Sequence, residues 1–292
     1  MPTFTTATGV ELYVQDVGAG DAVVMLAGFG LNHRAWDGQV RALATRHRVL
    51  CVDLKGTGRS DKPLEGYAVD TLAEEVLDVL TAMNVASFDL VGWSFGGQVA
   101  FRMTAVAGPR VNRLVLVGSN AVRASRSVDF PFGRDADRLE KALVRGENVD
   151  RATSRRATLA AGFARPPEEA VLDHLASLSM EMPSWAAIAC LASMYASDQI
   201  ADISRVCCPV LQITGDLDPV HPIDGARWLA DRLSSSALVT LKDCGHYPMF
   251  ESPLEFNAAL CEFVDSAASA SPERPYEAID VSVPRSTGGQ KL

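Results

Sequence analysis

The chain lacks an apolar run of the ~20 residues that cross a bilayer, and it does not open with a basic segment followed by an apolar core, as a signal peptide does. We therefore expect no membrane span, and the cytoplasm is the expected location. Lysine and arginine form no run, and the formal net charge is −9. Nucleic acid and anionic membranes are accordingly not expected as partners.

Metal-binding spacings are also missing. The six cysteines contain no Cys-x-x-Cys pair, and the five histidines form neither His-x-His nor His-Glu-x-x-His. Such spacings gather several ligands around one zinc ion. Most of the cysteines lie in apolar segments, where a free thiol behaves as a small hydrophobic side chain, and we expect them to be reduced. The sequence thus implies no metal and no organic cofactor.

What the chain does contain is a serine between glycines at the end of an apolar run. The apolar run 88–91 leads into Gly92-Trp93-Ser94-Phe95-Gly96-Gly97, and a helical pattern follows over 98–107. Gly-x-Ser-x-Gly between a strand and a helix is the nucleophile elbow, whose glycines let strand and helix pass closely while the turn points the hydroxyl outward. The motif alone also fits an ordinary turn with a solvated serine. Ser94 is expected to be a nucleophile only if an acid and then a histidine follow at the ends of later strands.

Short apolar segments alternate with helical patterns along most of the chain. The expected strands are 10–17, 22–27, 48–54, 88–91, 113–117, 209–214 and 238–241, and the expected helices between and after them are 36–46, 71–83, 98–107, 226–233 and 254–264. This alternation predicts an α/β fold, with a mostly parallel sheet that carries helices on both faces. Ligands of such sheets bind at the carboxyl ends of the strands.

The alternation stops after Ser119. Residues 120–204 show no strand pattern and predict four helices, at 136–145, 151–161, 168–178 and 184–196. The stretch is too long for a loop and leaves the sheet at the ligand-binding edge, so we expect a helical lid there. The expected domains are a core of residues 1–119 and 205–265, the lid of residues 120–204, and a flexible or surface-laid tail of residues 266–292.

Two later loops supply candidates for the acid and the base. Asp218 follows the expected strand 209–214, and His246 follows the last expected strand. The order serine, aspartate, histidine is the order of the α/β-hydrolase triad. Asp216 and Asp243 are rival acids that fit turn-forming roles better. His221 is a rival base, but a lid-contact or surface role before Pro222 fits it better than catalysis does.

Four motifs together resemble the α/β-hydrolase fold superfamily, in particular its lid-bearing esterase, lactonase and peroxidase-like group. The resemblance covers about residues 8 to 265 and implies an eight-stranded, mostly parallel sheet with a helical lid insertion. The motifs are Gly92-x-Ser94-x-Gly96-Gly97, Asp53-x-x-Gly56-x-Gly58-x-Ser60, Gly215-x-x-Asp218-x-x-x-Pro222 and Gly245-His246-x-Pro248. The spacing after the glycine of the third motif favours Asp218 over Asp216.

The resemblance also implies roles for these residues. Ser94 would be the nucleophile, His246 the base that takes its proton, and Asp218 the acid that orients the histidine. The backbone N–H groups of Phe29 and Phe95 would form the oxyanion hole. The chain departs from the family at Ala27, where a histidine usually stands, and this leaves open how the oxyanion loop is braced.

Trp93, Trp185, Met194 and His33 are expected to line an apolar substrate pocket, although packing between lid and core would explain the apolar ones equally well. The expected function is hydrolysis of a carboxylic ester or lactone of a small to medium, largely apolar substrate through an acyl-enzyme. Three alternatives reuse the same residues: a carbon–carbon bond hydrolase of a diketone-type substrate, a cofactor-free perhydrolase or peroxidase, and a non-hydrolytic cyclase or ligand receptor. A small molecule is the expected partner, and a homo-oligomer stays open.

Overall fold

The computed structural model describes residues 3–266, and the predicted tail from residue 267 onward lies outside the described residues. One sheet has the strand order β1-β2-β4-β3-β5-β6-β7-β8. Its strands are β1 (Thr3–Thr5), β2 (Glu11–Gly18), β3 (Ala22–Leu26), β4 (Arg48–Val52), β5 (Phe88–Trp93), β6 (Val111–Val117), β7 (Val210–Gly215) and β8 (Ser236–Leu241). β1 and β4 both pair antiparallel to β2, and all other pairs are parallel. The prediction of an eight-stranded, mostly parallel sheet is confirmed.

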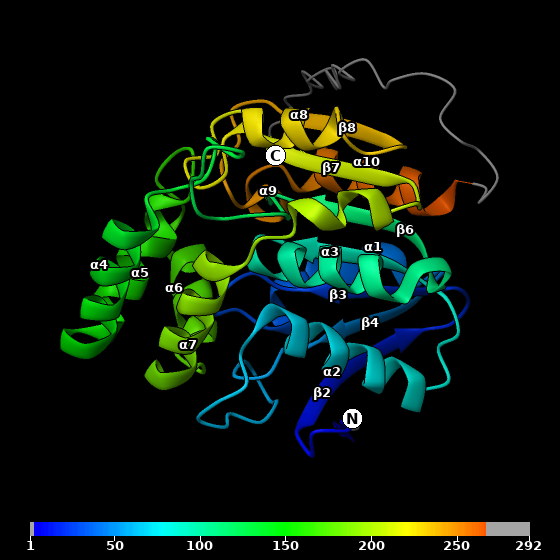
Figure 1. Ribbon diagram of the computed structural model, residues 1–292, viewed down its shortest axis with the longest axis horizontal. Helices are drawn as coiled ribbons and strands as arrows, with labels where there is room; N and C mark the ends of the chain where they lie inside the picture. Colours follow the sequence, from blue (N-terminus) through cyan, green and yellow to red (C-terminus); the bar gives the residue numbers. More distant parts are fainter. Residues whose placement is uncertain (1–2, 267–292) are drawn as a thin grey trace, which may run out of the picture.

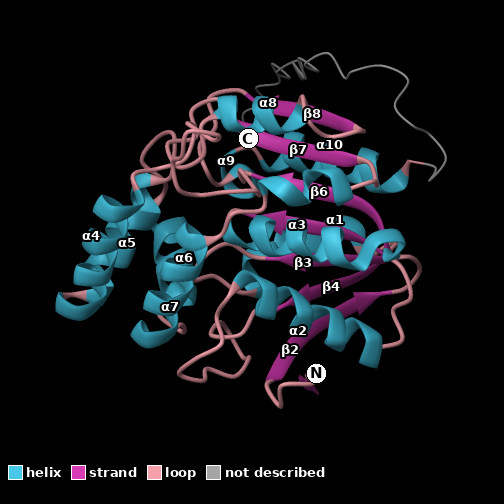
Figure 2. Ribbon diagram, in the orientation of Figure 1, coloured by secondary structure: helices cyan, strands magenta, loops and turns pink. Residues whose placement is uncertain are grey.

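Helices cover both faces of the sheet, as Figure 2 shows. They are α1 (Asp37–Leu43), α2 (Val69–Ala82), α3 (Phe95–Ala107), α8 (Ile223–Ala230), α9 (Pro248–Glu251) and α10 (Pro253–Asp265), with the short 3₁₀ helices η1 (His33–Trp36), η2 (Gly108–Arg110) and η3 (Ile200–Arg205). Helices α2, α3 and α8 pack on one face, and α1, α9 and α10 pack on the other.

The central strands explain this two-sided cover. Every residue of β3 is buried, and consecutive side chains point to opposite faces of a sheet. Val24 and Leu26 therefore join the core under α2 and α3, while Val23 and Met25 join the core under α1 and α10. A strand buried on both faces must be apolar at every position, which is why β3 appears in the sequence as a continuous apolar run.

Four α-helices lie between β6 and β7 in the chain and stand together beside the sheet (Figure 1). We call α4 (Ala136–Val149), α5 (Arg151–Ala161), α6 (Glu169–Ser179) and α7 (Ser184–Ala196) the cap. The bounds of α5 and α7 match the predicted ones, and α4 runs four residues beyond its predicted end at Arg145. The domain boundaries and the role of the cap as a lid stay predictions.

Within residues 3–266, no single helix is long and apolar enough to cross a membrane. Helices α6 and α7 reach the necessary length and apolarity only as a pair, and that pair is bent by 95°.

Candidate active site

Ser94 stands alone between the end of β5 and the start of α3, in a backbone conformation with φ 53° and ψ −117°. A residue with a Cβ atom is strained there, and surrounding contacts must hold it. Its N–H donates to the Val117 carbonyl at 2.9 Å, and the Ser119 hydroxyl donates to the Ser94 carbonyl at 2.8 Å. Both partners come from β6 and the residues after it, so the neighbouring strand secures the turn.

The glycines of the motif are required by close backbone approach. A Cβ atom on Gly92 would lie 2.5 Å from the Gly96 carbonyl oxygen, and one on Gly96 would lie 2.5 Å from the Ala27 carbonyl oxygen. No side chain fits at such distances. The turn between β5 and α3 therefore has the crowding that the sequence motif predicts.

The structure brings Ser94, His246 and Asp218 into one chain of hydrogen bonds. His246 Nε2 lies 2.9 Å from Ser94 Oγ, and His246 Nδ1 lies 2.9 Å from Asp218 Oδ2. All three residues are buried. With a carboxylate facing Nδ1, the ring proton belongs on Nδ1 and leaves Nε2 free to accept from the hydroxyl. The geometry is what the predicted triad needs, and the catalytic roles stay predictions.

Asp218 is positioned by both of its oxygens. Oδ1 accepts the N–H groups of Val220 at 2.7 Å and His221 at 2.9 Å, which leaves Oδ2 for His246. Burial would raise the pKa of Asp218, but the charge and hydrogen bond of His246 outweigh it and hold that pKa below its usual value. Of the rival acids, Asp216 accepts from the Cys244 N–H at 3.2 Å, and Asp243 pairs with Arg165 at 3.3 Å.

The main chain of His246 is fixed on two sides. Its N–H donates to the Gly162 carbonyl at 2.8 Å, next to the end of α5 in the cap. Its carbonyl accepts from the indole of Trp93 at 3.0 Å. The cap and β5 thus both contribute to the position of the imidazole ring.

Phe29 and Phe95, whose backbone N–H groups are the predicted oxyanion donors, each stand next to a residue at the serine turn. Phe95 is the first residue of α3, so its N–H has no acceptor within the helix. Phe29 follows Gly28, whose backbone passes so close that an added Cβ atom would lie 3.3 Å from Ser94 Cβ. Within residues 3–266, neither N–H has a backbone carbonyl as an acceptor in a turn, loop or cap. This arrangement agrees with the predicted oxyanion hole, whose role stays a prediction.

A cavity of about 350 Å³ opens onto Ser94 and His246. The cap contributes apolar side chains to its wall, namely Leu139, Leu143, Leu159, Leu191 and Met194. Trp93 and Met194, two of the predicted pocket residues, line this cavity. Within residues 3–266, no cluster of three or more His, Cys, Asp or Glu side chains could hold a metal ion.

Trp185 and His33, the other two predicted pocket residues, do not line the cavity. Trp185 is 49% exposed at the start of α7, and its indole donates to the Lys62 carbonyl at 3.2 Å. His33 turns its ring away to Asp53, with Nδ1 2.9 Å from Oδ1. Both positions follow from polar ring atoms that find partners in neighbouring loops rather than in the cavity.

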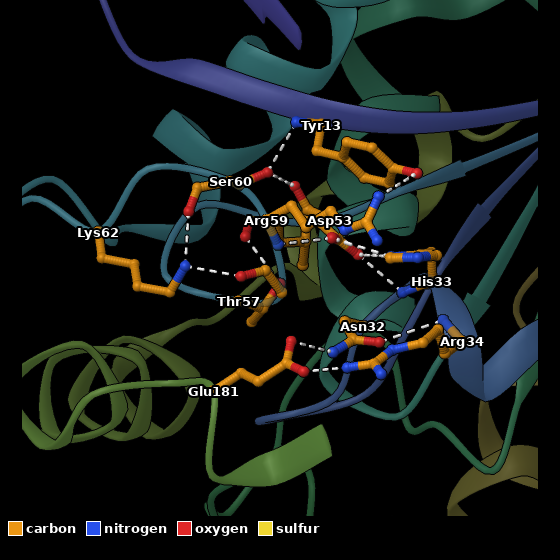
Figure 3. A network of polar contacts seen from close by, with 12 residues as sticks. Tyr13, Asn32, His33, Arg34, Asp53, Thr57, Arg59, Ser60, Lys62 and Glu181 are labelled. Carbon is orange, nitrogen blue, oxygen red and sulfur yellow. Dashed lines mark hydrogen bonds and ion pairs between the residues drawn. The ribbon is translucent and has the colours of Figure 1, made fainter. Parts of the chain in front are cut away.

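Asp53 organises the loops beside the active site, a role that sequence analysis missed (Figure 3). Its side chain is fully buried and accepts the backbone N–H groups of His33 at 2.7 Å and Arg59 at 2.9 Å. Its carbonyl accepts from the Ser60 hydroxyl at 2.6 Å. The loop after β3 and the glycine-rich loop after β4 are thereby joined. The available signal was the aspartate that opens the glycine-loop motif.

A buried ion pair in the cap was also missed. Arg155 Nε lies 2.6 Å from Glu147 Oε1, and Arg155 Nη2 lies 2.7 Å from Glu147 Oε2. Both residues line the cavity, so one of its walls combines leucines with a neutralised charge pair. The two side chains come from different helices, α4 and α5, and no helical spacing relates them.

His221 is a second histidine in the cavity wall, with its ring centroid 5.4 Å from that of His246. The ring is buried, and its Nδ1 has no hydrogen-bond partner within the described chain. Burial, and next the charge of His246, lower the pKa of His221 to about 4, while Asp218 opposes the shift. His221 is therefore neutral in the folded protein at neutral pH.

This pKa makes folding stability depend on pH. Between pH 6.5 and 4 the imidazole binds a proton in the unfolded chain but not in the folded protein, so stability falls as the pH falls. A pKa difference of about 2.5, at 1.36 kcal/mol for each unit, amounts to about 3 kcal/mol.

In urea unfolding, we expect the wild type to lose about that much more stability between pH 7 and pH 4 than His221→Gln does. His174→Gln, at an exposed cap histidine, is the control and should keep the wild-type slope. Equal slopes for wild type and His221→Gln would contradict the assignment.

A serine in a strained strand-to-helix turn, hydrogen-bonded through histidine to aspartate at the edge of a mostly parallel sheet, defines the α/β-hydrolase class. Comparison with known proteins agrees. The family described as alpha/beta hydrolase fold matches residues 21–253. The chain therefore belongs to the α/β hydrolase fold family.

Several relatives are similar over almost their whole length. A pimeloyl-acyl-carrier-protein methyl ester esterase of Nitrosomonas europaea is 31% identical over 252 residues, which cover 84% of this chain and 96% of that protein. An esterase of Exiguobacterium antarcticum has a TM-score of 0.87 at 26% identity, covering 90% of this chain and 99% of that one. A bromoperoxidase of Bacillus anthracis has a TM-score of 0.85 at 25% identity, covering 91% and 100%.

Proposed function

We propose that the protein is a serine hydrolase that cleaves a carboxylic ester or lactone of a small to medium, largely apolar substrate. The observation that carries the proposal is the hydrogen-bond chain from Asp218 through His246 to Ser94, with both contacts at 2.9 Å, where it meets the cavity. A serine hydroxyl reacts with an ester carbonyl when a base within hydrogen-bond reach removes its proton. His246 Nε2 is placed for that step.

In the first half of the reaction, Ser94 Oγ attacks the carbonyl carbon and its proton passes to His246 Nε2. The carbonyl oxygen gains a negative charge, which the N–H groups of Phe29 and Phe95 stabilise. The tetrahedral intermediate collapses to an acyl-enzyme on Ser94 when His246 returns the proton to the departing alcohol. Asp218 stabilises the imidazolium while the ring carries its second proton.

In the second half, water attacks the acyl carbonyl. His246 takes a proton from that water, and the same backbone N–H groups hold the new oxyanion. Collapse releases the carboxylic acid and returns the proton to Ser94. A lactone follows the same steps, except that the departing alcohol stays attached to the acyl group.

The cap serves as the lid in this proposal. Its leucines and Met194 line the same cavity as Ser94 and His246, so a substrate bound at Ser94 would also contact the cap. A cavity of about 350 Å³ lies at the lower end of the range for small-molecule sites, which is about 300–1,000 Å³. Small to medium acyl groups fit such a volume. The esterases among the similar proteins support ester cleavage.

A fluorophosphonate probe and a series of nitrophenyl esters test the proposal together. We expect the intact mass of the wild type to increase by one adduct, and peptide mapping to place it on Ser94. Nitrophenyl esters graded by acyl length should show turnover that peaks at short to medium chains, because the cavity limits length. His246→Ala should slow labelling, and Ser177→Ala, at an exposed serine of the cap, should leave it unchanged.

Other outcomes separate the alternatives. An adduct without ester turnover would favour carbon–carbon bond hydrolysis or a cyclase, which a diketone-type substrate then tests. Bromination in the presence of peroxide and acetate would favour the perhydrolase reaction, which the similarity to a bromoperoxidase makes the second candidate. The absence of any adduct would overturn the serine-hydrolase proposal and favour a ligand receptor.

A further inference from the structure

The loop that carries Phe29 touches the cap directly. Gly30 adopts φ +74°, and a Cβ atom added to it would lie 3.3 Å from Ser179 Oγ and 4.0 Å from Met182 Sδ. Ser179 and Met182 flank the turn that connects α6 to α7. The loop backbone at Gly30 therefore lies against side chains of the cap at Ser179 and Met182, so the two segments are in packing contact.

Glu181, in that turn of the cap, holds the loop by polar contacts (Figure 3). Its Oε2 accepts from Asn32 Nδ2 at 3.0 Å, and its Oε1 forms an ion pair with Arg34. The Asn32 side chain is fully buried, and its Oδ1 accepts the Arg34 N–H at 3.1 Å as the cap of the short helix η1. The Glu181 carboxylate thus binds two residues of the loop, at three and five positions after Phe29.

The opposite side of the same segment is held by the core. His33, between the two partners of Glu181, is bonded through its ring and its N–H to the buried Asp53. Ala27, at the start of the loop, offers no polar side chain for bracing. Two carboxylates therefore brace the loop: Asp53 from the core, which stays in place, and Glu181 from the cap.

The turn that holds Glu181 is locked to the rest of the cap. Arg155 of α5 donates to the Ser179 carbonyl and, at 2.8 Å, to the Met182 carbonyl. The same guanidinium binds Glu147 of α4 through two hydrogen bonds. Both charged residues are buried. A displacement of α4 or α5 would accordingly move the turn between α6 and α7. The Glu181 carboxylate, which binds the loop, would move with that turn.

We propose that Glu181 is a positioning residue that couples the seated cap to the oxyanion hole, so that the Phe29 N–H is held in place only while the cap rests on the core. The inference rests on the proposed function, because an oxyanion hole matters only if a carbonyl is attacked at Ser94. Its physical content, a carboxylate of the cap that fixes the loop after β3, does not depend on the reaction.

The first test measures Glu181→Ala by kinetics. Loss of one oxyanion donor costs about 10²–10³ in kcat, and a displaced donor costs less, so we expect kcat on a nitrophenyl ester to fall roughly 10-fold. KM should stay within about twofold, because the loop holds the transition state rather than the acyl chain. Affinity for a trifluoromethyl ketone, which forms a tetrahedral oxyanion on serine, should fall in parallel with kcat. In Glu181→Gln, the side-chain amide oxygen can still accept from Asn32. Its kcat should therefore lie between that of the wild type and that of Glu181→Ala.

Asp173→Ala is the matched control. Asp173 also pairs with an arginine on the exposed side of the cap, through Arg156 at 2.6 Å, and its side chain is 67% exposed. We expect its kcat and ketone affinity to equal those of the wild type. An equal loss in Asp173→Ala and Glu181→Ala would mean that general loosening of the cap is responsible, and this would overturn the proposal.

Hydrogen exchange tests the coupling without any reaction. Glu181→Ala should speed amide exchange in a peptide spanning residues 28–36, while a peptide spanning residues 95–105 of α3 keeps its wild-type rate. Unchanged exchange in residues 28–36 would overturn the proposal whatever the activity. Faster exchange there in a protein that neither binds the fluorophosphonate nor cleaves esters would reject the hydrolase function and leave the coupling in place.

Discussion

Replacement of Ser94 by alanine is expected to reduce kcat/KM for the preferred nitrophenyl ester by about 10⁴–10⁶, to the level that binding and the oxyanion hole sustain alone. The reason is that, among residues 3–266, Ser94 Oγ is the nucleophile on His246 Nε2, at a distance of 2.9 Å. Substrate binding should persist, because the cavity wall does not change. Steady-state kinetics and inhibition by a product acid measure the two quantities separately.

The fold should survive this change. Within the described chain, the Ser94 side chain has its hydrogen bond to His246, while the turn is held by backbone contacts to Val117 and Ser119. A melting temperature close to that of the wild type therefore accompanies the loss of activity. Retention of more than a tenth of wild-type turnover in Ser94→Ala would show that the reaction does not pass through this serine.

Asp218→Asn is expected to lower kcat by about 10⁴, by analogy with the same change in a serine protease triad. Asp218 Oδ1 accepts two backbone N–H groups, from Val220 and His221, so an asparagine would keep its carbonyl oxygen on that side. Its NH₂ group would then face His246 Nδ1 and force the ring proton onto Nε2. A protonated Nε2 in the neutral ring cannot accept the proton of Ser94.

Asp216→Asn is the control for the acid. Asp216 lies two residues away on the same loop and accepts from the Cys244 N–H at 3.2 Å rather than from His246. We expect it to keep kcat within about threefold of wild type, since only a bond to a backbone amide changes. A large loss in Asp216→Asn together with a small loss in Asp218→Asn would reverse the assignment of the acid.

The predictions for Ser94→Ala and Asp218→Asn depend on the core, whereas the proposed preference for acyl length would depend on the cap. Ser94, Asp218 and His246 follow the carboxyl ends of β5, β7 and β8, and their spacing is set by a sheet in which every residue of β5 and β7 is buried. The cavity wall opposite them comes from helices joined by the Arg155–Glu147 ion pair. Substitutions in that wall should change acyl-length preference more than they change the chemical step.

Local pattern was enough to predict seven of the eight strands, the four cap helices and the order of the three polar residues. Apolar runs and glycine spacing act over a few residues along the chain, and the structure follows them at β3, α5 and α7. The edge strand β1 was not predicted, because three residues of a threonine-rich segment become a strand only by pairing with Tyr13, Leu12 and Glu11.

The sequence by itself therefore determined the family, the sheet and the three residues that meet at 2.9 Å, because each is marked by a motif in which glycine, serine, aspartate or histidine has a local geometric reason. Only the tertiary structure decided the contacts of the residues around these three. In the folded chain, His33 binds Asp53, Trp185 lies at the surface, and Glu181 binds the loop that carries Phe29. These contacts link residues up to 149 positions apart, and no spacing along the chain records which buried polar group will find which partner.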